Sequence, residues 1–262
     1  MEKVQAQCRA IFRLIFFCIL AAGFFVQTFW VHFTEKDPLK RRRYYVGASS
    51  RYARRLMRFF NVHIRVKNPP PTDDVHLHVQ NHMGFLDVLI LCSVTPNCFV
   101  TSQEMREFPL LGLICEMGGC LFVERRDRSR IFREMEVLAQ AMRDGFRVTL
   151  YPEATSTDGE QVLPFKKTLM TAAALADVPL QPVVFNWISI DGEPFTLKNR
   201  DKVCWYGEMS FAPSMWEHLK LKEVVAEIEY LEPIHTTLQD DRTKVAELAH
   251  QRISDHFRSC LK

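Results

Sequence analysis

The sequence lacks the cysteine patterns that mark zinc-bound and disulfide-bridged proteins. Its eight cysteines lie at positions 8, 18, 92, 98, 115, 120, 204 and 260, and no two of them form a C-x-x-C pair. This scatter argues against a zinc knuckle and a disulfide framework and fits a reducing compartment. The G-x-S-x-G turn of serine hydrolases is also missing. The chain therefore offers no recognisable motif for a protein nucleophile.

Full charges are missing from residues 14–33, LIFFCILAAGFFVQTFWVHF. A helix of this length is about 30 Å long, enough to cross the hydrocarbon core of a bilayer. No small-residue cleavage site follows it and the basic cluster LKRRR comes soon after, so we expect a retained membrane anchor. Basic residues flank both ends, which leaves open whether the helix crosses the bilayer or dips into one leaflet. The denser basic cluster predicts that the globular part is cytoplasmic.

Acidic residues are missing between Pro38 and Thr72. Residues 1–71 carry 14 Lys and Arg against 3 acids, whereas the remaining 191 residues carry 20 against 28. The N-terminal part is therefore expected to face an anionic surface, ahead of a mildly acidic globular domain. In segment 44–60 arginines alternate with tyrosine, leucine and phenylalanine. This pattern predicts a helix lying in a lipid interface and argues against a nucleic-acid partner.

Residues 67–74, KNPPPTDD, have the composition of a linker, and we place the domain boundary there. The predicted parts are a membrane-anchoring segment of hydrophobic and basic helices, 1–68, and a globular domain, 69–262. Alternating strands and helices predict that this domain is a single α/β domain with a largely parallel central sheet flanked by helices. The predicted strands cover 75–80, 98–102, 120–124, 146–150, 179–190, 202–211 and 223–234. The predicted helices cover 85–94, 129–144, 167–177 and 241–257. Residues 109–119 are expected to be rich in loops.

The stretch VQNHMGFLD, residues 79–87, places Asp87 five residues after His82 at the end of a predicted strand. Inside one regular helix the two side chains would be roughly 140° apart and could not meet. They meet if His82 lies on a turn before a helix and Asp87 lies about one turn inside it. The helix dipole then favours the neutral imidazole and the carboxylate orients the ring, as in a general base and its partner. The activated hydroxyl is expected to belong to a substrate.

Two other interpretations of these residues stay open. The pair can be purely structural, because a lone His-x4-Asp pattern is weak evidence of catalysis. Alternatively, His76 and His78 share one face of the strand and could form a zinc site with His82 and Asp87. Against zinc, the third histidine would come from a turn beyond the strand. The chain also lacks the H-x-H-x-D-H order of metallo-hydrolases, so we predict no metal.

Two further segments carry polar side chains just after predicted strands. GGCLFVERR, residues 118–126, ends in Arg125 and Arg126, cations that suit a phosphate. LYPEATSTDGEQVLPFKK, residues 150–167, presents Glu153 and small hydroxyl residues, followed by Lys166 and Lys167. Ligands of α/β sheets bind beyond the carboxyl ends of the strands. Neither segment is diagnostic alone, but together with the pair at 82 and 87 they favour acyl transfer.

Taken in order, these segments resemble the glycerolipid acyltransferase superfamily, in particular the bacterial 1-acylglycerol-3-phosphate acyltransferases of the PlsC type. The family motif N-H-x-S-x-x-D is similar to residues 81–87, and G-x-x-F-[IV]-x-R is similar to residues 119–125. F-P-E-G-T-R-S is similar to YPEATST, residues 151–157, and V-P-[IV]-x-P-V to VPLQPV, residues 178–183. Four ordered motifs are far more specific than any one of them.

The resemblance implies a glycerol-3-phosphate acyltransferase-like fold and an enzyme of the bacterial inner membrane, with its catalytic domain on the cytoplasmic side. It implies transfer of an acyl group from acyl-CoA or acyl carrier protein to the hydroxyl of a membrane lysolipid. His82 would be the general base and Asp87 its orienting partner, with no metal and no organic cofactor. The residues implied in acceptor binding are Asn81, Arg125, Glu153, Thr155, Ser156 and Lys166.

Three positions depart from the family motifs: Gly84 replaces serine, Ala154 replaces glycine, and Ser156 replaces an arginine that resembles a partner for the acceptor phosphate. Losing a bidentate cation costs phosphate recognition more than it costs the chemistry. The acceptor ranked first is 1-acylglycerol-3-phosphate, which would give phosphatidic acid.

Lyso-ornithine lipid, which has no phosphate, is the alternative acceptor. The segment EATSTDG followed by VLPFK resembles relatives that acylate that lipid. Lys166 or Lys167 could instead take the place of the missing arginine. The alternative of another class is a non-catalytic peripheral membrane-binding protein.

Overall fold

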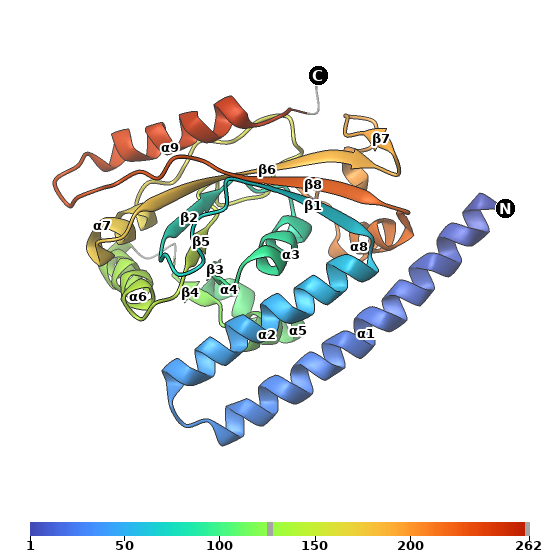
Figure 1. The fold of residues 1–262 in the computed structure, drawn as a ribbon, viewed down its shortest axis with the longest axis horizontal. Helices are drawn as coiled ribbons and strands as arrows, with labels where there is room; N and C mark the ends of the chain where they lie inside the picture. The colour runs from blue at the N-terminus through green and yellow to red at the C-terminus, as the bar shows by residue number, and fades with distance from the viewer. Residues whose placement is uncertain (125–127, 260–262) are drawn as a thin grey trace.

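The strands of the chain form one twisted sheet at the centre of the molecule (Figure 1). The computed structural model describes residues 1–124 and 128–259. The strands lie in the order β1-β8-β6-β2-β5-β3-β4, with β7 paired to β6. All pairs are parallel except β6–β8 and β6–β7, which confirms the predicted α/β class with a largely parallel sheet. The strands are β1 (Val62–Lys67), β2 (Leu77–Gln80), β3 (Cys98–Ser102), β4 (Leu121–Val123), β5 (Val148–Leu150), β6 (Leu180–Ile190), β7 (Glu193–Pro194) and β8 (Val224–Tyr230).

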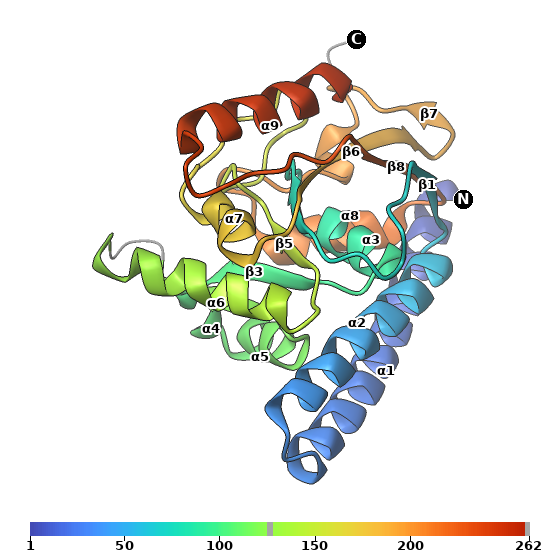
Figure 2. The same cartoon turned by 60° about the vertical axis from the view of Figure 1, so that its left-hand side comes forward.

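Helices cover both faces of this sheet (Figures 1 and 2). One apolar layer, which includes Phe185 and Ile228, lies under α2 (Pro38–Phe59), α3 (Phe85–Val94) and α8 (Phe211–Lys220). The other layer, which includes Leu77 and Val148, lies under α6 (Ile131–Arg143), α7 (Ala172–Ala176) and α9 (Arg242–His256). The remaining described helices are α1 (Glu2–Thr34), α4 (Gln103–Arg106), α5 (Pro109–Met117) and the short 3-10 helices η1 (Arg128–Arg130), η2 (Leu169–Thr171) and η3 (Arg200–Lys202).

Strand β2 lies inside the sheet between β5 and β6, with both neighbours parallel to it. Leu77 and Val79 are fully buried on one face, and His78 and Gln80 are fully buried on the other. A parallel strand buried on both faces is rigidly placed, because helices cover both of its sides. The turn after Gln80 is therefore held at the carboxyl edge of the sheet, beside the carboxyl end of β5.

The first two helices form an antiparallel pair on the outside of the α/β domain (Figures 1 and 2). Helix α1 is long and apolar enough to cross a membrane, judged by length and composition. It also packs on the protein: Phe16 stacks on Phe59 with ring centroids 3.5 Å apart, and buried Arg13 donates to the carbonyl of Leu221 at 2.5 Å. Its exposed apolar side chains include Ile11, Phe12, Ile15, Ile19, Val26, Trp30 and Phe33.

The strand predicted at 202–211 is wrong. Residues 200–202 form η3, the following residues form a loop, and α8 begins at Phe211. The residues of this stretch pack against helices rather than beside a strand: Val203 and Cys204 are buried in the apolar layer that includes α3, and Trp205 contacts Phe85 and Phe211. The backbone of Gly207 has a φ of 56°, a left-handed conformation that ends any extended run.

Two other elements also differ from the expectation. The loop-rich passage at 109–119 is largely helical, because α5 occupies Pro109–Met117. Strand β1 was not predicted, and it pairs in parallel with β8 from Val62 to Lys67. Its alternation of apolar and polar residues, VHIRVK, is the signal that could have found it. The sheet thus includes residues ahead of the predicted boundary at residue 69.

Candidate active site

The turn of residues 81–84 joins the carboxyl end of β2 to α3 and brings His82 and Asp87 together. The Nδ1 atom of His82 lies 3.1 Å from each carboxylate oxygen of Asp87. Asp87 is fully buried, whereas the His82 side chain is 19% exposed. The predicted geometry, a histidine on the turn and an aspartate one turn inside the helix, is confirmed.

The Asp87 carboxylate also caps α3. Its Oδ2 atom accepts hydrogen bonds from the main-chain N–H groups of Met83 at 2.6 Å and Gly84 at 3.0 Å. A buried carboxylate with two amide donors is held as an acceptor, so the hydrogen of the imidazole belongs on Nδ1. That tautomer leaves a lone pair on Nε2. Within residues 1–124 and 128–259, no hydrogen bond to Nε2 is found.

The main chain of His82 is fixed by the segment that follows β5. The N–H of His82 donates to Oε1 of Glu153 at 2.7 Å, and Oε2 of Glu153 accepts from the N–H of Leu163 at 2.7 Å. On the other side, the carbonyl of His82 accepts from the N–H of Thr157 at 2.8 Å and from its hydroxyl at 3.1 Å. The two turns predicted to form the site therefore lie against each other.

Glu153 is buried, and burial raises its pKa to about 7. The two N–H donors favour the charged carboxylate and so oppose this rise. Both carboxylate oxygens already accept main-chain hydrogen bonds. The structure therefore shows Glu153 joining the His82 turn to the loop at Leu163. The predicted contact of this residue with the acceptor stays a prediction.

Asn81, also predicted to bind substrate, points into the sheet. Its Nδ2 atom donates to the carbonyl of Phe185 at 3.0 Å, and its Oδ1 atom accepts from the N–H of Phe185 at 2.8 Å. The residue is buried. These contacts join the first residue of the turn to β6 and so fix the position of the turn relative to the sheet.

The other predicted acceptor residues lie on the loop after β5. Thr155 is exposed, and Ser156 donates through Oγ to the carbonyl of Trp205. Lys166 is exposed and its main-chain N–H donates to the carbonyl of Pro152 at 2.8 Å. Lys167 donates through Nζ to Thr243 Oγ1 at 2.6 Å, which places it at the start of α9. Arg125 lies outside the described residues.

One neighbour of the dyad, Tyr151, was not among the predicted site residues. The ring of Tyr151 lies 4.3 Å from the ring of His82, and burial, followed by the charge of Asp87, raises the pKa of its hydroxyl well above the usual range. Tyr151 is thus a neutral phenol packed on the imidazole. Its position directly after β5, as the first residue of YPEATST, is the signal that could have found it.

The zinc interpretation has no support in the arrangement of the histidines. His76 lies just before β2 and His78 lies within it, with ring centroids 6.1 Å apart, while His82 lies beyond the other end of the strand. Burial lowers the pKa of His78 to about 3. Among residues 1–124 and 128–259, no three His, Cys, Asp or Glu side chains gather in a way that could hold a metal ion.

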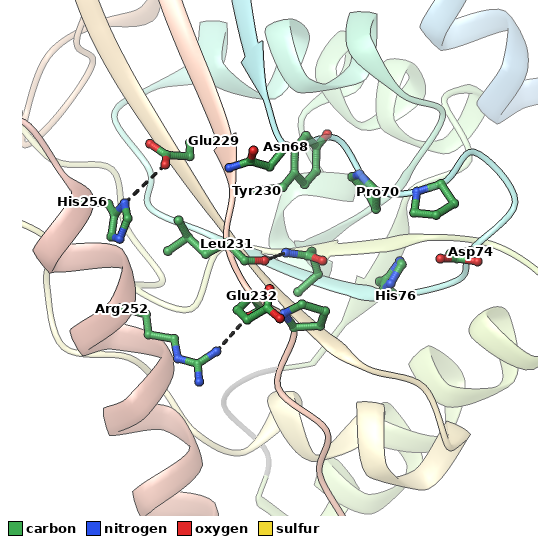
Figure 3. A pocket seen from close by; sticks show the side chains of 13 residues that line it. Asn68, Pro70, Asp74, His76, Glu229, Tyr230, Leu231, Glu232, Arg252 and His256 are labelled. Atoms are coloured by element: carbon green, nitrogen blue, oxygen red, sulfur yellow. Dashed lines mark hydrogen bonds and ion pairs between the residues drawn. The ribbon is translucent and has the colours of Figure 1, made fainter.

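A cavity of about 560 Å³ lies at the amino end of β2, away from the dyad (Figure 3). His76, Tyr230 and Glu232 are among its lining residues, and the ion pair of His256 with Glu229, 3.4 Å apart, lies at its edge. Because the imidazole of His82 is at the opposite end of the strand, this cavity takes no part in the chemistry of the dyad.

Comparisons with known proteins point to acyl transfer. Residues 61–186 match the family model described as Acyltransferase. The lyso-ornithine lipid O-acyltransferase of Brucella abortus is 27% identical over 217 residues, which cover 80% of this chain and 81% of that protein. The 1-acyl-sn-glycerol-3-phosphate acyltransferase of Neisseria gonorrhoeae is 23% identical over 62% of this chain and 61% of that protein.

The fold also has a solved counterpart. The crystal structure of PlsC from Thermotoga maritima, a 1-acyl-sn-glycerophosphate acyltransferase, matches with a TM-score of 0.70 over 98% of this chain and 96% of that chain, at 16% identity. The matched family model, the named relatives and the fold indicate that the chain is an acyltransferase enzyme. Its fold is that of a PlsC-type acyltransferase.

The raised pKa of Glu153 predicts a pH-dependent stability. Between about pH 4.5 and pH 7 the folded protein holds a proton that the unfolded chain has released, so the free energy of unfolding falls as pH rises through this window. The expected fall is about 3 kcal/mol. Glu153→Gln should abolish this fall, and the exposed Glu247→Gln should keep it. Urea unfolding of the three proteins at pH 5 and pH 7.5 measures the free energy of unfolding at each pH. An equal fall between the two pH values in Glu153→Gln and in wild type would contradict the account.

Proposed function

We propose that the protein transfers an acyl group from acyl-CoA or acyl carrier protein to the hydroxyl of a lysolipid. The observation that carries this proposal is the His82–Asp87 pair, with the carboxylate buried and the imidazole partly exposed. A histidine oriented in this way is suited to take a proton from a hydroxyl group. The family match supports acyl transfer as the reaction that uses it.

In the proposed reaction, Nε2 of His82 accepts the proton of the acceptor hydroxyl while the oxygen attacks the thioester carbonyl. The buried carboxylate of Asp87 offsets the charge that develops on the imidazolium. Collapse of the tetrahedral intermediate forms the ester and expels the thiolate. The imidazolium then returns its proton to the thiolate, so the step is balanced. This chemistry uses the two co-substrates alone.

Lyso-ornithine lipid is the acceptor best supported by the named relatives and by the residue at position 156. The first four relatives found among curated proteins are named lyso-ornithine lipid O-acyltransferases, at 27–31% identity. Ser156 presents a small hydroxyl where the resemblance places a phosphate-binding arginine. Lysophosphatidate, ranked first from the sequence motifs, is the second candidate, and the relative from Neisseria gonorrhoeae supports it.

The N-terminal helices are proposed to bring the active site to the membrane that holds the acceptor. The exposed apolar side of α1, with Trp30 and Phe33, and the arginines of α2 are the features that suit a lipid surface. Because α1 packs along α2 and Arg13 ties it to the end of α8, we favour a pair that dips into one leaflet. The inner membrane and its cytoplasmic side are part of this proposal.

Replacing the proposed base tests the activity. His82→Ala should reduce acyl transfer about 10²- to 10⁴-fold with the fold intact, because the general base is lost. His63→Ala, an exposed histidine on β1, is the matched control and should keep wild-type activity. Release of thiol from the acyl donor measures the rate. Equal activity of the His82→Ala and wild-type proteins would contradict the role of His82 as the base, whereas a wild-type protein that releases no thiol would favour the non-catalytic membrane-binding alternative.

The acceptor is tested by direct comparison. Purified enzyme is given lyso-ornithine lipid or lysophosphatidate, each with acyl-CoA and with acyl carrier protein as donor. We expect a higher kcat/KM for lyso-ornithine lipid with at least one donor, because a site with serine at position 156 loses a bidentate phosphate contact. A higher value for lysophosphatidate with both donors would reverse the ranking of the two acceptors.

A further inference from the structure

The loop of residues 203–210, between η3 and α8, packs against both turns that surround His82. Val203 and Cys204 are buried beside α3. The N–H of Trp205 donates to the carbonyl of Met83 at 2.9 Å, and the carbonyl of Trp205 accepts from Oγ of Ser156. The main chain of one residue thus joins the turn after β2 to the turn after β5. We refer to residues 203–210 as the Trp205 loop.

Gly84 makes room for this contact. A Cβ atom at position 84 would lie 2.9 Å from the nitrogen and 3.2 Å from the Cβ atom of Trp205. The φ of Gly84 is 149°, a conformation that side chains with a Cβ rarely adopt. A serine at this position, as in the family motif, would push the Trp205 loop away from the turn. Two of the three departures from the motifs, Gly84 and Ser156, therefore meet at the same residue.

The Trp205 loop is anchored on its other side as well. The indole of Trp205 donates to the carbonyl of Met209 at 2.7 Å and packs at right angles to Phe211, with ring centroids 6.2 Å apart. Arg200, just before the loop, pairs with Asp158 at 3.1 Å and with Glu160, both on the segment after Ser156. These contacts hold the carbonyl of Trp205 beside position 156.

A carbonyl at this place changes the chemistry that the site offers. A main-chain carbonyl is a hydrogen-bond acceptor, so it can pair with an ammonium or hydroxyl group but not with an ionised phosphate. A guanidinium at position 156 would offer donors in the same region. Because its N–H donates to the carbonyl of Met83, the residue that follows His82, Trp205 lies next to the turn that carries the base.

We propose that Trp205 is a specificity-determining residue: its main chain, seated on Gly84 and bonded to Ser156, closes the acceptor site to phosphate headgroups and admits headgroups that carry an ammonium group. This inference rests on the proposed lysolipid acyltransferase function. It assigns acceptor choice to a loop that lies outside the four motifs and about 120 residues after the dyad.

The test measures kcat/KM for lyso-ornithine lipid and for lysophosphatidate and takes their ratio. Gly84→Ala adds the Cβ that displaces Trp205 and should lower the ratio about ten-fold. Ser156→Ala removes one hydrogen bond to the carbonyl and should lower it about three- to ten-fold. Tyr206→Phe, which loses only a bond of 2.7 Å to Asp201 on the outer side of the loop, should leave the ratio unchanged.

The ratio separates specificity from damage to the fold. A variant that is merely misfolded loses activity with both acceptors alike, and such an equal loss in both Gly84→Ala and Ser156→Ala would overturn the inference. An unchanged ratio in these two variants would overturn it as well. Failure of the wild-type enzyme to acylate either lipid would instead contradict the proposed function, and this outcome is visible before any variant is compared. Circular dichroism and thermal unfolding establish that each variant is folded.

Discussion

The site depends on one buried carboxylate. Asp87 accepts hydrogen bonds from Nδ1 of His82 and from the N–H groups of Met83 and Gly84, and it has no exposed surface. A buried charge is tolerated only when its acceptor positions are filled. The same contacts that stabilise the charge also start α3 and set the ring plane of His82. Helix capping and orientation of the base are therefore one interaction, and loss of the carboxylate would disturb both.

A second layer of contacts fixes the main chain on which this interaction is built. Glu153 and Thr157 hold the N–H and carbonyl of His82 from the turn after β5, while Asn81 joins the turn to β6. One turn follows β2 and the other follows its parallel neighbour β5, which is why the site lies at the carboxyl edge of the sheet. Several motif residues thus hold the base in place through main-chain bonds.

The parts of the site that depend on short-range geometry were predictable. The offset of His82 and Asp87 admits one arrangement at a strand-to-helix turn, and α3 occupies the predicted Phe85–Val94. Contacts across the chain were not predictable in the same way. The partner of Asn81 is 104 residues away, and the Trp205 loop has an aromatic, apolar sequence that favours a strand although its N–H pairs with a loop carbonyl. The local preference of a segment for strand or helix carries no information about such tertiary contacts.

The central claim is that the free nitrogen of His82 takes a proton from a lipid hydroxyl. A crystal structure of the enzyme with lysolipid and an unreactive acyl-CoA analogue tests it most directly. The account predicts that the acceptor oxygen lies about 3 Å from Nε2, with Nδ1 still on Asp87. A hydroxyl bound beyond reach of this nitrogen, for example in the cavity beside His76 and Tyr230, would contradict it.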